Sequence, residues 1–279
     1  MDNHLHLVLR NRPDIVETWT DREVARRYCF ICPSTRNKDG SAKEPLPCEI
    51  DRVMQDKGSE KLRQSVSSIS LFMQLITQPI AQRANKEDDV RGHFFADRFK
   101  SDRLETEEDV LSCSLYVNLN AVRAGVVDTP ENSEYTSAFE RIQARWQEHD
   151  AAMRAQDGES TDEECVERRD AWLSPVFLDE SADAYTETPQ AQSQGPGEPS
   201  NVCNAAGAAR ISNKGYLSIS FEAYLQLMDL VGRMIRPDKR GSIPKELPPI
   251  LARLQLDLDH LVERVQHAFL SKNAACRFG

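Results

Sequence analysis

One acidic stretch divides this chain and limits how much of it can fold around a single core. Between Glu148 and Glu198 the sequence holds 14 Asp and Glu residues against 3 Arg, a net charge of −11, and it is rich in Ser, Gln, Pro and Gly. Segments of this composition bury too little apolar surface to fold and usually serve as linkers. We therefore predict three parts: residues 1–145, an acidic and largely disordered linker at 146–205, and a helical C-terminal region at 206–279.

The rest of the chain is close to neutral. The whole sequence carries a net charge of −10, so the part outside the acidic stretch carries about +1 and can present basic surfaces to nucleic acid. The hydrophobic content of 39% suffices for one or two cores, and no apolar run approaches the roughly 20 residues that span a bilayer. The seven cysteines are odd in number and scattered, which favours a reducing compartment. We predict a cytoplasmic protein with no membrane partner.

A His-x-His pair lies at the start of the sequence. Residues 1–10 have the alternating pattern of a β-strand, with a leucine at every second position from Leu5. Residues two apart on a strand point to the same face, so the imidazoles of His4 and His6 would project together and could share one metal ion. An exposed pair of histidines without a ligand is the alternative.

A tyrosine lies on the best-defined helix that the sequence predicts. Thr106 begins this helix with a capping box to Asp109, and Gly125 ends it. Tyr116 and Asn120 are four residues apart and share a face. A tyrosine phenol can form a covalent phosphodiester with DNA when a nearby cation neutralises the phosphate, and an amide oxygen one turn away could serve as a metal ligand. A half-buried aromatic side chain without a chemical role is the alternative.

Three segments, in this order, resemble those of the single-tyrosine HUH transposases, which include the REP-associated and insertion-sequence enzymes. They are MDNHLHLVL at Met1–Leu9, GHFFADRFK at Gly92–Lys100 and YVNLNAVRAG at Tyr116–Gly125. The short segment YTSA at Tyr135–Ala138 resembles the one that follows in the family. The resemblance covers residues 1–140.

The resemblance implies a site and a reaction. His4 and His6 match the metal-binding pair, Tyr116 matches the nucleophile, and Asn120 matches the polar residue that completes the metal site. The metal would be Mg²⁺ or Mn²⁺. The family cleaves single-stranded DNA beside a hairpin, keeps the strand as a 5′-phosphotyrosine, leaves a free 3′-OH and then rejoins strands.

The resemblance also implies an α+β fold: a ferredoxin-like sheet with helices packed on it. The family usually carries a strand, a helix and another strand before the His-x-His strand, whereas this sequence begins at the motif. We therefore expect an N-terminally truncated HUH core. We also expect the acidic linker and the C-terminal helices to follow it.

Several basic residues are candidates for DNA contacts. Arg98, Lys100 and Arg103 belong to or follow the second family segment, and Arg123 lies on the tyrosine helix. They are predicted to contact DNA phosphates, with a solvated surface as the alternative. The charged segment Arg236–Arg240 is interpreted as a solvent-facing loop.

Three functional hypotheses follow. The first is a metal-dependent transposase that cleaves and rejoins single-stranded or hairpin DNA. The second is a catalytically inactive remnant that still binds such DNA. The third is another HUH nuclease, which the tail after Tyr116 disfavours. The sequence leaves open whether a homodimer shares its active sites.

Overall fold

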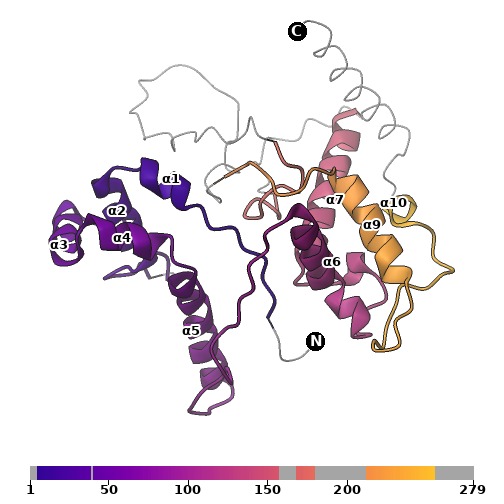
Figure 1. Ribbon diagram of the computed structural model, residues 1–279, viewed down its shortest axis with the longest axis horizontal. Helices are drawn as coiled ribbons and strands as arrows, with labels where there is room; N and C mark the ends of the chain where they lie inside the picture. Colours follow the sequence, from indigo (N-terminus) through magenta and orange to yellow (C-terminus); the bar gives the residue numbers. More distant parts are fainter. Residues whose placement is uncertain (1–4, 39, 157–167, 180–211, 255–279) are drawn as a thin grey trace, which may run out of the picture. The chain divides into compact units, whose positions relative to one another are not determined.

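The computed structural model describes residues 5–38, 40–156, 168–179 and 212–254. The chain divides into two compact units (Figure 1). Unit 1 combines Met1–Val8 with Leu104–Gly279, and unit 2 is formed by Leu9–Arg103. Unit 1 therefore joins the first residues of the chain to a region that begins about a hundred residues later.

Unit 2 is helical, and its helices are separated by short capped breaks. Residues 14–31 have the apolar spacing of a single helix, but Thr20 interrupts it, because its hydroxyl accepts a hydrogen bond from Glu23 N and starts a new helix. Ser68 starts a new helix in the same way within the apolar pattern of residues 59–85. The helices of unit 2 are α1 (Pro13–Thr18), α2 (Asp21–Ile31), α3 (Pro47–Lys57), α4 (Ser59–Val66) and α5 (Ile69–Glu87).

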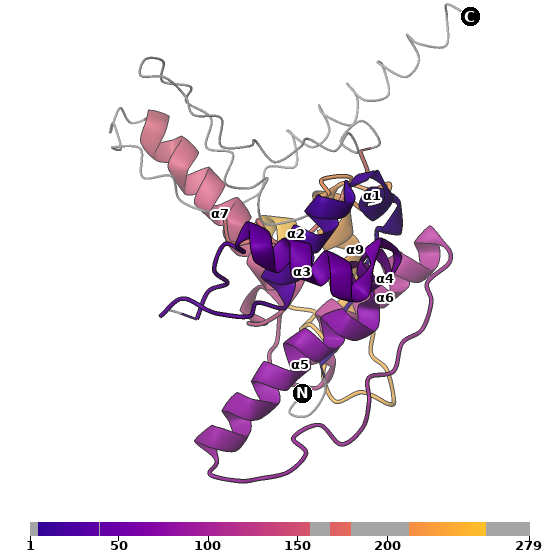
Figure 2. The ribbon, with the colours of Figure 1, turned by 90° about the vertical axis from the view of Figure 1, so that its left-hand side faces the viewer.

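Helices α1, α2, α3 and α4 share a small hydrophobic core. Arg63 on α4 donates to the backbone carbonyls of Val16 and Trp19, which ties the break between α1 and α2 to the core. Helix α5 has no buried residue and runs away from the other helices of unit 2 (Figure 2). The core consists of Ile15, Val16, Trp19, Val24, Ala25, Cys29, Ile50 and Leu62.

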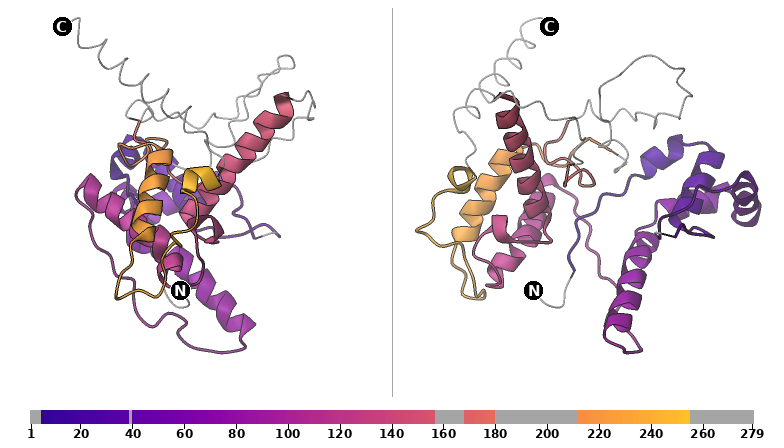
Figure 3. Two further views of the ribbon diagram at one scale, coloured as in Figure 1. Left: turned by 90° about the vertical axis from the view of Figure 1, so that its right-hand side faces the viewer. Right: turned by 180° about the vertical axis from the view of Figure 1, so that it is seen from behind.

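Unit 1 is built on the tyrosine helix, α6 (Glu107–Arg123). The predicted capping box of Thr106 and Asp109 is confirmed, and Gly125 has the predicted left-handed conformation, with φ of 68°. Helices α6, α7 and α9 lie side by side (Figure 3). The elements after α6 are the 3-10 helix η1 (Pro130–Asn132), α7 (Ser137–Gln156), α9 (Phe221–Arg233) and α10 (Ile250–Arg253).

The core of unit 1 draws on segments far apart in the sequence. Leu119 on α6 packs with Leu225 and Met228 on α9, so the C-terminal region shares a core with the tyrosine helix. Val176, which lies within the acidic stretch of the sequence, is also buried there, and the neighbouring Phe177 pairs with Leu217 in a single parallel bridge. The C-terminal region therefore positions the face of α6 that carries Tyr116.

The predicted ferredoxin-like α+β fold is wrong. The described parts of the chain contain helices and two isolated β-bridges, and no sheet. Residues 5–10 have no regular structure, and Leu5, Leu7 and Leu9 are 52%, 42% and 41% exposed. Residues 91–104, which contain the second family segment, also form no strand. Alternating leucines become a strand only beside another strand that takes their backbone hydrogen bonds, and within these ranges there is none.

The C-terminal region is helical where the structure describes it, as predicted. Its first apolar pattern, over residues 221–235, forms α9. A second, over 251–265, lies mostly outside the described residues, and α10 covers its start. None of the helices described is both long enough and apolar enough to cross a membrane.

Candidate active site

Tyr116 occupies the exposed side of α6. The neighbouring side of the helix is held in the core by Leu115, Leu119 and Val122, which recur at intervals of three and four residues. Tyr116 falls between these positions and is 51% exposed. The packing of α6 therefore presents the phenol to solvent and fixes the direction from which a substrate can approach.

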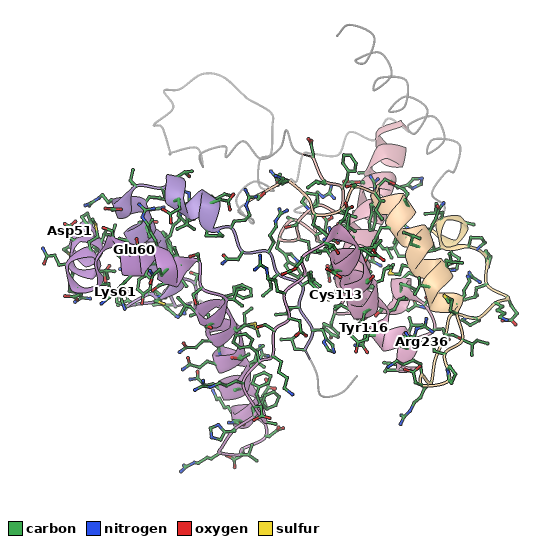
Figure 4. The ribbon with its side chains drawn as sticks, viewed as in Figure 1. Asp51, Glu60, Lys61, Cys113, Tyr116 and Arg236 are labelled. Carbon is green, nitrogen blue, oxygen red and sulfur yellow. The ribbon has the colours of Figure 1, made fainter. Side chains whose placement is uncertain are left out.

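A cleft with a volume of about 450 Å³ lies beside Tyr116. One wall is α6, and the other is formed by the end of α9 and the loop that follows it. Tyr116 comes from the first wall and Arg236 from the second (Figure 4). The cleft is lined by Ser112, Leu115, Tyr116, Leu119, Asn120, Arg123, Ala124, Val231, Arg236, Asp238, Lys239 and Arg240.

The cleft carries a net positive charge. Four of its lining side chains are cationic and one, Asp238, is a carboxylate. Burial lowers the pKa of Arg123 from its ordinary value, and the like charge of Arg236 lowers it further. Clustered cations in a partly enclosed site attract an anion, because the ligand removes their mutual repulsion.

Asn120 contributes an amide with unused hydrogen-bonding capacity. Its Nδ2 is buried and has no hydrogen-bond partner within the described residues. A buried donor without a partner costs roughly 1–3 kcal/mol, so such groups usually bind a ligand, an ion or water. Asn120 lies one helical turn from Tyr116 and lines the same cleft, which makes it a natural contact for whatever the cleft binds.

His6 reaches the tyrosine although its segment is not a strand. The ring centroids of His6 and Tyr116 are 5.6 Å apart, and the rings meet edge to face at 83°. The imidazole and phenol that the sequence predicted as partners are therefore neighbours. His4, the other predicted metal ligand, lies outside the described residues.

The donors around Tyr116 suit a metal ion in part. His6 offers an imidazole. Rotation of the Asn120 amide by 180° about its side-chain bond would place an oxygen where the unpartnered Nδ2 lies, and oxygen is the ligand that Mg²⁺ and Mn²⁺ favour. No group of three or more His, Cys, Asp and Glu side chains suited to a metal occurs in the part of the chain that the structure describes. A metal at Tyr116 would therefore need His4 as well as His6 and Asn120.

Arg123 has a structural role beside its place in the cleft. Its guanidinium donates hydrogen bonds to the backbone carbonyls of Val231, at 2.6 Å, and Met234, at 2.5 Å. These neutral acceptors hold the end of α9 against α6, and they carry no charge that would cancel that of the guanidinium. Arg123 can therefore act on a bound anion through its field while staying in place.

The other predicted DNA contacts belong to unit 2. Arg98, Lys100 and Arg103 are exposed in a segment without regular structure. Tyr116 belongs to unit 1. The predicted role of these three residues stays a prediction.

The interpretation of the Arg236–Arg240 segment changes. The sequence indicated a solvent-facing loop, and the side chains are exposed, but Arg236, Lys239 and Arg240 form a wall of the Tyr116 cleft. The available signal was a dense set of cations closed by Gly241 directly after a helix. Nothing in the sequence indicated which surface that loop would meet.

No protein-family model, curated protein or solved structure matches this chain in the comparisons made. The function is therefore argued from the residues of the site and from the resemblance of its motifs.

Proposed function

We propose that this chain cleaves and rejoins single-stranded hairpin DNA, with Tyr116 as the nucleophile. One observation carries this proposal: the half-exposed phenol of Tyr116 lies in a cation-lined cleft with the His6 imidazole against its ring. A phosphodiester is the anion that matches both the charge of the cleft and a tyrosine nucleophile. The motif resemblance to single-tyrosine HUH transposases supports the same reaction.

The reaction balances without water or a nucleotide cofactor. The phenolic oxygen of Tyr116 forms a bond to the phosphorus, and the bond from phosphorus to the 3′-oxygen breaks. The phenol loses one proton and the departing 3′-oxygen gains one. The strand is then held as a 5′-phosphotyrosine, and attack by a 3′-OH reverses the step and rejoins the DNA. Each transesterification conserves one phosphodiester bond.

The residues around Tyr116 have separate tasks in this scheme. The positive field of Arg123 offsets the charge that builds up on the phosphate oxygens. The Asn120 amide orients the phosphate or serves as a ligand. His6 packs against the phenol ring and restricts its orientation. Together they favour in-line attack by the phenol.

A divalent cation belongs to the proposal as an expectation. Mg²⁺ or Mn²⁺ would be held by His4, His6 and Asn120. When bound, the ion would neutralise phosphate charge and lower the pKa of a nearby hydroxyl group.

A covalent adduct assay tests the proposal. Wild-type protein, Mn²⁺ and a library of labelled single-stranded hairpins should give a protein–DNA adduct that survives denaturation, with the label on the peptide containing Tyr116. Tyr116→Phe should abolish the adduct. Tyr135→Phe is the matched control, because Tyr135 is 97% exposed and does not line the cleft. The catalytic proposal is refuted if Tyr116→Phe still forms the adduct, or if wild-type protein forms no adduct with any hairpin.

A second candidate is a DNA-binding protein without catalysis. It is favoured by the lack of a sheet in the described ranges, because no strand there presents His6 in a fixed position. If this candidate is right, hairpin binding weakens with salt, no adduct forms, and His6→Ala leaves the affinity unchanged.

A homodimer stays a prediction, which light scattering on the purified protein tests.

A further inference from the structure

The loop after α9 is fastened to the end of the tyrosine helix. The backbone N–H groups of Arg240 and Gly241 both donate to the carbonyl oxygen of Arg123, each at 3.2 Å. The Arg123 side chain donates in the opposite sense, to the carbonyls of Val231 and Met234. Hydrogen bonds in both directions hold this loop in a fixed position.

Close packing at Gly241 makes the attachment specific. A Cβ atom at this position would lie 2.1 Å from the carbonyl oxygen of Val122 and 3.0 Å from the backbone of Gly125. Both neighbours are main-chain atoms, which cannot move aside as a flexible side chain would. Only glycine allows the loop to approach the end of α6 this closely.

The attachment turns the loop's cations towards the cleft. Arg236, Lys239 and Arg240 all line it, opposite Tyr116 and Asn120. Asp238 is the carboxylate among them, and it is shared between Arg236, at 3.4 Å, and Lys239, at 3.5 Å. The Arg240 side chain makes no hydrogen bond or ion pair with any residue the structure describes. The loop therefore holds more positive charge than its own carboxylate can balance.

We infer that the loop Arg236–Arg240 is a binding site for the sugar–phosphate backbone of a single DNA strand, and that it holds the phosphates next to the one at Tyr116. This inference rests on the proposed function for the identity of the strand. Three cations along one wall suit a polyanion better than a single phosphate, since they are spread over five residues. The loop lies outside the region of family resemblance, so the motifs do not assign it this role.

Equilibrium binding tests the loop apart from any chemistry. All variants are made in Tyr116→Phe protein, and affinity for a fluorescent single-stranded hairpin is measured between low and high salt. For single strands each phosphate contact adds about 0.7 to the slope of log K against log salt, which corresponds to about fourfold in affinity near 0.15 M salt. Arg240→Gln should therefore weaken binding about fourfold and reduce the slope by about 0.7.

A control removes one positive charge close to the loop but outside the cleft. Lys245→Gln lies shortly after the loop but does not line the cleft, so it should change neither affinity nor slope. Neutralising Arg236, Lys239 and Arg240 together should weaken binding about fifty-fold. Equal losses for Arg240→Gln and Lys245→Gln, or no loss in the triple variant, overturn the inference.

Competition separates a strand from a free anion. Inorganic phosphate added at constant ionic strength should displace little of the bound hairpin. Full displacement would assign the loop to a single phosphate and overturn the strand proposal. If the loop variants weaken binding as expected but wild-type Tyr116 protein forms no covalent adduct, the catalytic proposal alone is refuted. An adduct that forms equally well in the triple variant would refute the loop alone.

Discussion

Replacing Arg253 by methionine should destabilise unit 1 by about 3–5 kcal/mol, as expected when one partner of a buried ion pair is removed. Arg253 is 10% exposed and donates to three groups: the Glu131 carboxylate, Asp229 at 3.0 Å and the carbonyl of Pro248 at 2.6 Å. Methionine keeps most of the apolar part of the side chain but removes the ion-pair partner of the Glu131 carboxylate, which is only 11% exposed. Asp229 loses less, because Arg233 stays at 2.7 Å.

Urea titration measures this loss. With a slope of about 2 kcal/mol per M, a loss of 4 kcal/mol moves the unfolding midpoint by about 2 M. Hydrogen exchange in peptides from α6 and α9 assigns the transition to unit 1. Arg169→Met is the control, since Arg169 is 45% exposed and its ion pair with Glu140 should contribute at most about 1 kcal/mol.

A double-mutant cycle identifies the cause. If the stranded carboxylate is responsible, Glu131→Gln should recover at least about 1 kcal/mol in the Arg253→Met background, although it destabilises the wild type. The reasoning is refuted if Arg253→Met costs less than about 1 kcal/mol. It is also refuted if the two substitutions simply add.

Two further predictions concern contacts of α6. Hydrogen bonds from the backbone and side chain of Ser218 hold the pKa of Glu107 below its ordinary value of 4.5. The hydrogen bonds between Ser218 and the Glu107 carboxylate therefore stabilise the fold above about pH 4.5, and this stabilisation is lost as the pH falls through the lower folded-state pKa. The stability difference between wild type and Glu107→Gln should vanish on acidification. A constant difference in urea titrations across this range would contradict the prediction. Gly241→Ala should lower the free energy of unfolding by about 1–3 kcal/mol and weaken hairpin binding without changing any charge, because the added Cβ meets the Val122 carbonyl. Unchanged affinity would show that binding does not depend on the attachment of the loop.

The sequence predicted features whose physical cause is local. The start of α6 follows from the hydroxyl of Thr106 and the carboxylate of Asp109, three residues apart, and its end follows from Gly125. The face that carries Tyr116 and Asn120 follows from the helical period. These signals need no knowledge of the rest of the chain.

Features that depend on distant segments could not be predicted in this way. Alternating leucines from Leu5 indicate a strand only if a second strand is present, and the described ranges contain none beside it. The pairing of the Arg236–Arg240 loop with Tyr116 depends on backbone hydrogen bonds to Arg123, more than a hundred residues earlier in the chain. Charge alone could not distinguish this wall from a solvated surface.

The attachment of Gly241 to Arg123 also sets an order of events during protein synthesis. Translation produces Tyr116 first, on a helix whose core partners on α9 have yet to be made. The positively charged wall becomes available only after the loop has also left the ribosome, more than a hundred residues later. A nascent chain, or one terminated before the loop, therefore carries the Tyr116 phenol without the three cations of the loop. Under the proposed function, such a chain lacks the groups that draw DNA to the site.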